Sequence, residues 1–147
     1  MKLLILLLAF QLPAVEWLGN IDIAKTEAQK SHKLILVNFA GSDWCIPCIR
    51  LRKEILESEK FTSYAADNLV LLRADFPRLK KNRLNKEQTR LNEALADKYN
   101  PNGAFPLTLL IDADGKVLKK WDGFPDLSPE QFTAQISAIK DSQSNKH

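Results

Sequence analysis

Apolar residues form separate clusters along the chain, and the spacing within four of them predicts β-strands. Residues 34–39 are almost continuously apolar, which is typical of a strand covered on both faces. Residues 68–74, Asn-Leu-Val-Leu-Leu-Arg-Ala, form the next predicted strand. A third strand starts directly after a Phe-Pro pair, and a tight turn at Asp112-Ala113-Asp114-Gly115 leads into a fourth, so these two form a hairpin. The last two predicted strands are therefore 107–111 and 116–121.

The segments between and around these strands have the period of amphipathic helices. Ser58 and Ser128 are placed as N-caps, and Pro129 stands at the first position of the last helix. We expect the polar tail from 141 to 147 to be frayed. Neither repeats nor linkers interrupt the pattern, so residues 15–147 are interpreted as one domain. The predicted helices are 21–31, 48 to about 60, 84–98 and 128–140. Ser58 also caps a second short helix, which runs to residue 66.

Both cysteines of the chain, Cys45 and Cys48, lie where the first buried strand gives way to a helical segment. A Cys-x-x-Cys pair at a strand-to-helix junction indicates redox chemistry. The free N–H groups and the positive end of a helix favour the thiolate of Cys45, and a thiolate is the nucleophile of disulfide exchange. Cys48 follows one turn later, close enough to close a ring with Cys45. We therefore predict that Cys45 attacks and Cys48 resolves.

The residues around the pair fit that chemistry. Pro47 lacks an N–H, which is tolerated in the first turn of a helix. Trp44 and Ile46 place apolar surface beside the sulfur atoms, where an extended client can dock.

Other interpretations of the same residues remain open but are less favoured. The pair can be one inert disulfide or two buried thiols, although so short a ring stabilises little. A metal or cluster needs about four ligands, and the chain has two cysteines and two histidines, so we expect neither a metal nor another cofactor unless two chains share a cluster. Trp121 and Phe124 are interpreted as packing residues, and Asp112 and Asp114 as turn formers.

Charge adds two observations. The net charge of +3 is too small to indicate nucleic-acid binding. Between 77 and 90, however, the chain is strongly basic. A run of charge is usually a solvated face, and we favour that interpretation over a partner-docking patch. The segment sets six cations against the single acid Glu87: Arg78, Lys80, Lys81, Arg83, Lys86 and Arg90.

The first fourteen residues have the plan of an export signal. Lys2 precedes eight apolar residues, 3–10, and Leu12-Pro13-Ala14 offers a cleavage site. Such a stretch is too short to span a bilayer. Residues 1–14 are therefore interpreted as a signal peptide, the alternative being a buried N-terminal strand or helix. Its removal leaves a protein without stable membrane insertion, in the periplasm or another extracytoplasmic space.

Over residues 16–140 the chain resembles the thioredoxin superfamily. The matching points are the strand leading into Trp44-Cys45-Ile46-Pro47-Cys48, the Phe105-Pro106 pair and the hairpin 112–116. It is most similar to extracytoplasmic thioredoxin-like proteins, a group also similar to the C-terminal domain of thiol:disulfide interchange reductases. The resemblance implies an α/β fold: a three-layer α/β/α sandwich with a mixed central sheet and the Cys-x-x-Cys at a helix N-terminus.

The resemblance also implies roles. Cys45 is the attacking thiol and Cys48 the buried resolving thiol, while Pro106 is a cis-proline facing the disulfide. The backbone of Phe105 pairs with an extended substrate, and Trp44 flanks the site. The implied activity is thiol–disulfide oxidoreduction without a dissociable cofactor. The implied partners are protein disulfides and an upstream thiol reductase or electron donor, and we expect a monomer.

Three features depart from the family pattern. Asn38 stands where many thioredoxins have a buried aspartate, and an amide cannot act as a base near neutral pH; Asp43, Glu54 or a water can substitute. Residues 40–43 contain one extra residue. The Ile46-Pro47 dipeptide lacks the histidine of strongly oxidising relatives, so we favour a reductase or isomerase-type donor. The alternative function is a client-binding or chaperone-like module with incidental cysteines.

Overall fold

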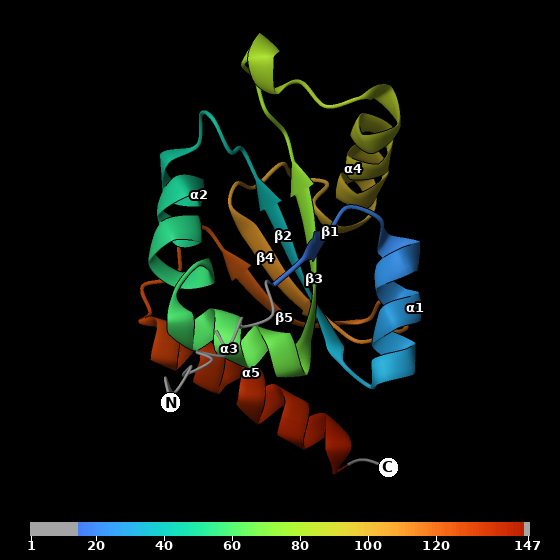
Figure 1. Ribbon diagram of the computed structural model, residues 1–147, viewed down its shortest axis with the longest axis vertical. Helices are drawn as coiled ribbons and strands as arrows, with labels where there is room; N and C mark the ends of the chain where they lie inside the picture. The colour runs from blue at the N-terminus through green and yellow to red at the C-terminus, as the bar shows by residue number, and fades with distance from the viewer. Residues whose placement is uncertain (1–14, 146–147) are drawn as a thin grey trace, which may run out of the picture.

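The computed structural model describes residues 15–145 and is built around a five-stranded sheet with the order β1-β3-β2-β4-β5 (Figure 1). β1 and β2 run parallel to β3, whereas β4 runs antiparallel to both β2 and β5. The sheet is therefore mixed, as expected. Its strands are β1 (Trp17–Leu18), β2 (Leu34–Ala40), β3 (Leu69–Asp75), β4 (Leu107–Ile111) and β5 (Val117–Asp122).

Helices cover both faces of the sheet and make the three layers that the resemblance implied (Figure 1). On one face lie α1 (Ile21–Ser31) and α4 (Lys86–Tyr99). On the other lie α2 (Ile46–Leu51) with its π-helical continuation η1 (Arg52–Leu56), α3 (Glu59–Asn68) and α5 (Pro129–Ser144). Every residue of β2 is buried, because alternate side chains enter the two apolar cores.

Local signals set the helix ends. The side chains of Ser58, Asn85 and Ser128 each accept a hydrogen bond from a backbone N–H of the first turn, and Ser128 forms a capping box with Gln131. The caps at Ser58 and Ser128 and the position of Pro129 are confirmed.

Several predicted boundaries were wrong. The two-residue β1 was missed because so short an edge strand has no period of its own. The helix after the cysteines begins at Ile46 and changes to π-helical turns at Arg52. The last helix continues to Ser144, so the predicted fraying from residue 141 is wrong. The predicted signal peptide, residues 1–14, lies outside the described residues. Between 15 and 145, no helix has the length and apolar character needed to cross a membrane.

Candidate redox site

The cysteine pair lies just beyond the end of β2, at the start of α2. Cys45 is the N-cap residue, and its Sγ accepts a hydrogen bond from the backbone N–H of Cys48 at 3.3 Å. The two sulfur atoms are joined in a disulfide, with the Cα atoms 5.2 Å apart. Only 5% of Cys45 and 4% of Cys48 is exposed. The predicted placement at a helix N-terminus is therefore confirmed, and both cysteines are almost completely buried.

Pro106 reaches the same place from the other direction along the sheet. The Phe105–Pro106 peptide bond is cis, as the resemblance implied. β4 pairs antiparallel with β2, with Leu107 opposite Phe39, so Pro106 lies level with the end of β2 that leads to the cysteines. Phe105 and Trp44 pack against a small cluster made by Ala40 and the two cysteines.

Trp44 is fixed by three kinds of contact. Its indole N–H donates to the carbonyl of Phe76 at 2.7 Å, and its ring meets the Phe105 ring edge-on at 5.5 Å between centroids. The Arg78 guanidinium lies over the indole, 3.6 Å from its centroid. Gly41 passes directly behind the ring, where any Cβ would overlap the indole.

The two residues between the cysteines form an exposed rim. Ile46 is 66% exposed, an unusual degree for a large apolar side chain, and Pro47 is exposed as well. Together with Trp44 and Phe105 they surround the disulfide with apolar surface. The arrangement suits contact with an extended chain held close to the Cys45 sulfur.

The interior beneath the pair is neutral. Asn38 lies on the same face of β2 as Leu36 and Ala40, facing α2, and is 2% exposed. Its side-chain amide donates to the hydroxyl of Thr108, the opposite residue on β4, at 3.2 Å. Asn38 therefore occupies the interior position as a hydrogen-bonded amide.

Neither proposed substitute for the missing acid lies in this interior. Glu54 is at the surface in a bidentate pair with Arg50. Asp43 is on the outer side of the site, and the backbone N–H of Arg78 is the main reason that the pKa of this carboxyl is lowered from its ordinary value. Of the three substitutes considered from the sequence, only a water molecule remains.

Sequence reasoning missed Asp75, which shapes the loop before the cysteines. Its carboxylate accepts hydrogen bonds from the backbone N–H of Ser42 at 2.9 Å and from the Ser42 hydroxyl. A usable signal existed, because β2 and β3 run parallel and their carboxyl ends meet at one edge of the sheet. A polar residue ending β3 is thus placed beside the loop that leaves β2.

Other predicted assignments were correct. Trp121 is buried against Phe132, and Phe124 lies under the Arg50 guanidinium, so both are packing residues. The Asp112 carboxylate accepts from the backbone N–H groups of Asp114 and Lys116, as a turn former does.

Comparison with known proteins agrees with this geometry. A family model described as a thioredoxin-like domain matches residues 21–140. "Disulfide bond reductase DsbH" of Chlamydia pneumoniae is 37% identical over 117 residues, covering 80% of this chain and 66% of that protein. "Thioredoxin-related protein DsbJ" of the same organism is 26% identical over 150 residues, covering 95% of this chain and 42% of that protein. This chain thus spans less than two thirds of either relative.

Solved structures give the same result. The structure titled "DsbH Oxidoreductase" superposes with a TM-score of 0.76 at 31% identity, covering 86% of this chain and 85% of that one. The oxidised C-terminal domain of Neisseria meningitidis DsbD superposes with a TM-score of 0.56 at 17% identity, covering 80% and 90% of the two chains. At that identity, the second likeness speaks for the fold alone.

Proposed function

The chain belongs to the thioredoxin-like domain family, and on that premise we propose that it is a thiol–disulfide oxidoreductase that reduces or exchanges disulfides of other proteins. One observation carries the proposal: its two cysteines form a pair at a helix N-terminus, opposite a cis-proline and inside an apolar rim. An inert disulfide does not require that rim to be exposed.

The reaction proceeds in two exchanges. In the reduced protein the Cys45 thiolate attacks one sulfur of a client disulfide, forming a mixed disulfide and releasing the first client thiolate, which takes a proton. The Cys48 thiol then loses its proton to water and attacks the Cys45 sulfur, releasing the second client thiolate, which takes a proton from the solvent. Two electrons and two protons have passed to the client, and the protein carries the Cys45–Cys48 disulfide. An upstream dithiol donor, acting by the reverse exchange, restores the reduced form.

The surrounding residues position the client in this scheme. Trp44, Ile46 and Pro47 supply the apolar contact, while the backbone at Phe105 pairs with an extended segment and Pro106 faces the disulfide. Asn38, which faces the interior below α2, is an amide and cannot accept the proton of the Cys48 thiol. That proton therefore goes to water.

We further propose that the protein acts as a reductase outside the cytoplasm. The relative from Chlamydia pneumoniae is named a disulfide bond reductase, which supports this direction of electron flow. The absence of a histidine between the cysteines supports it independently. Residues 1–14 act as the signal peptide that exports the chain.

Trapping of the mixed disulfide tests the reaction. The Cys48→Ala variant, reduced and mixed with a disulfide-bonded peptide, is expected to accumulate a covalent adduct at Cys45 that dithiothreitol releases. The Cys45→Ala variant is the matched control and is expected to form little adduct, because Cys45, at the N-cap of α2, is the cysteine whose thiolate the helix N-terminus favours. Peptide binding without any adduct in the Cys48→Ala variant would favour the client-binding module instead.

The direction of electron flow has its own test. Equilibration of the Cys45–Cys48 pair in glutathione buffers gives its reduction potential, and a potential as low as that of a thioredoxin is expected for a reductase. A high potential would indicate an oxidant or an isomerase.

A further inference from the structure

A basic segment arches over one side of the redox site. We call residues 77–86, between β3 and α4, the basic arch; it includes the short 3-10 helix η2 (Lys80–Asn82). In Figure 1 this yellow-green segment extends beyond the end of the sheet, on the side where α2 begins. It has five cations and no acid, and all five are exposed without an ion pair among the described residues: Arg78, Lys80, Lys81, Arg83 and Lys86.

The charge of the whole chain makes this segment stand out. The net charge of +3 includes the five cations of the basic arch, so the rest of the chain is net negative by two charges. A strongly polarised charge distribution steers a partner of opposite charge toward one face. Here that face is the one next to the cysteines.

The first end of the basic arch is tied to the redox site. The Asp43 carboxylate accepts hydrogen bonds from the backbone N–H groups of Arg78 and Leu79, both at 2.9 Å, and from the Asn82 amide at 3.0 Å. Asp43 immediately precedes Trp44, and the Arg78 guanidinium lies on the Trp44 ring. Arg78, the first cation of the arch, is therefore separated from Cys45 only by the Trp44 ring.

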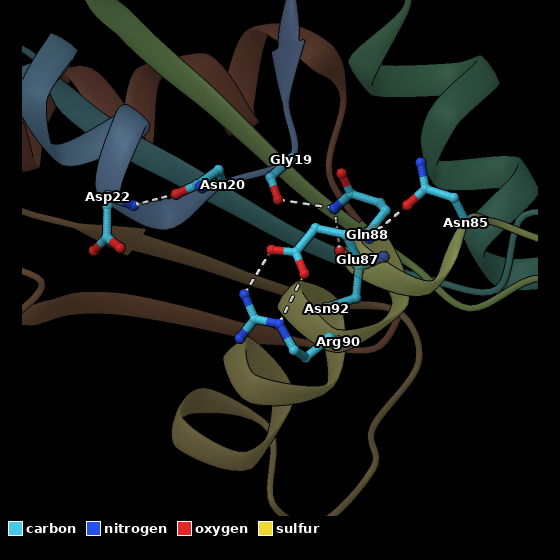
Figure 2. A network of polar contacts seen from close by, with 8 residues as sticks. All are labelled: Gly19, Asn20, Asp22, Asn85, Glu87, Gln88, Arg90 and Asn92. Carbon is cyan, nitrogen blue, oxygen red and sulfur yellow. Dashed lines mark hydrogen bonds and ion pairs between the residues drawn. The ribbon is translucent and has the colours of Figure 1, made fainter.

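The second end is tied to the body of the domain. Asn92 is 3% exposed and donates to the carbonyl of Asp75 at 2.8 Å. As Figure 2 shows, Gln88 joins this amide to the segment after β1: its side-chain N–H groups donate to the Asn92 carbonyl at 2.7 Å and to the Gly19 carbonyl at 2.8 Å. Asn85 caps α4 at the same place. The basic arch is thus held at both ends, which lowers the entropy lost when a partner binds.

A hollow of about 480 Å³ lies between the arch and α4. Its lining includes the cations Arg83, Lys86 and Arg90 as well as Glu93 and Asp75. The Asp75 carboxylate already accepts two hydrogen bonds from Ser42, and Arg90 forms a bidentate ion pair with Glu87. Arg83 and Lys86 remain as the cations that can receive a carboxylate there.

We propose that the basic arch selects the clients of the redox site by binding acidic side chains that flank the client disulfide. The inference rests on the proposed oxidoreductase function and names its substrate class: protein segments with Asp or Glu a few residues from the cystine. Arg78 meets the acid nearest the disulfide, and the cations farther along the arch meet the next ones.

Three probe peptides test the proposal. Each has the same intramolecular disulfide, followed by a run of glutamate, glutamine or lysine. The reduced full-length chain is mixed with each peptide, and the second-order rate constant of peptide reduction is measured at low and high salt. The wild type is expected to reduce the glutamate peptide about tenfold faster than the glutamine peptide at low salt, and the lysine peptide more slowly still. High salt should bring the three rates together.

Two charge variants separate the arch from net charge. Lys80→Gln, Lys81→Gln and Arg83→Gln in one chain should lower the rate with the glutamate peptide about tenfold and leave the glutamine peptide unchanged. The matched control, Lys53→Gln, Lys60→Gln and Lys116→Gln, removes the same charge from exposed positions outside the arch and should keep most of the preference.

The outcomes are distinguishable. If the arch variant keeps the preference for the glutamate peptide, or the control variant loses it equally, the proposal is overturned while the oxidoreductase function stands. If the wild type reduces all three peptides at one rate, the arch has no role in selection. If the wild type reduces none of them, the oxidoreductase function fails and the proposal fails with it.

Discussion

The two sides of the Cys45–Cys48 pair differ in charge and in exposure to solvent. Beneath the pair, Asn38 and Thr108 form a neutral hydrogen bond and are 2% and 0% exposed. Beside it, the basic arch is exposed and charged, and a carboxylate, Asp43, holds it. An ion below the pair would need a buried partner, whereas an ion at the surface keeps its hydration. The inner side thus keeps the surroundings of the cysteines uncharged. The outer side presents the charge that we propose binds the client.

Trp44 connects the two sides. Its ring contacts Phe105 next to the cis-proline and also carries the Arg78 guanidinium. A change that moves this ring should therefore disturb both sides, whereas a change at Asn38 or Asp43 should disturb one. The variants below use this difference.

Asn38→Asp should have the largest effect, because it places a carboxylate in the interior. Burial raises the pKa of such a group, so the folded protein binds its proton more tightly than the unfolded chain does. The variant should match the wild type in stability below the ordinary aspartate pKa of about 4. Its free energy of unfolding should then fall as pH rises from that ordinary value to the raised folded pKa, and above the folded pKa the loss should stay at about 3 kcal/mol. Urea unfolding at pH 3 and pH 8 measures the loss.

Asn38→Leu is the control, because it has a similar size and does not titrate. Its loss of stability should be the same at both pH values. A stable Asn38→Asp variant at pH 8 would show that Arg73, the neighbour of Asn38 in the β2–β3 register, had turned toward the new carboxylate. In the wild type that guanidinium lies over Trp17 of β1, on the far side of β3.

Gly41→Ala comes next, because it moves the residue shared by both sides. A Cβ at this position overlaps the Trp44 indole, so the ring must shift away from Phe76 and Arg78. We expect the free energy of unfolding to fall by about 2 kcal/mol, as in other overpacked sites. We also expect slower reduction of all three probe peptides. Thermal unfolding and the peptide assay measure the two effects.

Combining Gly41→Ala with Trp44→Phe provides the control, since the smaller ring leaves room for the added methyl group. The double variant should be more stable than the sum of the two single losses predicts. Simple additivity would show that the Gly41 substitution acts through the backbone of the loop and not through the Trp44 ring.

The fold and the place of the cysteine pair could be predicted from the sequence, because local patterns encode them. The run 34–39, the Cys-x-x-Cys and the Phe105-Pro106 pair each mark their own position, and Ser58 and Ser128 mark helix starts. The family resemblance then supplied the cis bond, which no local pattern specifies.

The outer side could not be predicted, because its contacts join distant segments. Asp43 binds backbone groups 35 and 36 residues away, and Gln88 reaches a carbonyl 69 residues away. In sequence, the cations of 77–90 are indistinguishable from an ordinary solvated face. The parallel pairing of β2 and β3 places the end of β3 beside the loop leaving β2, but the contacts of Asp43 with Arg78 and Leu79, which hold these cations next to the cysteines, are seen only in the structure.

Asp43→Ala should have the smallest and most local effect. It removes the acceptor of the Arg78 and Leu79 N–H groups without touching the core, so global stability should change little, whereas these two amides should exchange with solvent about tenfold faster. The Arg78 N–H is the main cause of the lowered pKa of Asp43, so in the wild type the same protection is complete above the ordinary aspartate pKa. The protection should be lost as pH falls through the lowered folded pKa.

Asp97→Ala, which removes an exposed acid from α4, should leave both amides protected. Equal exchange of these amides in the wild type and Asp43→Ala would mean that the stacking of Arg78 on Trp44 holds the arch in place of the carboxylate, and the outer side would then depend on the same ring as the inner one.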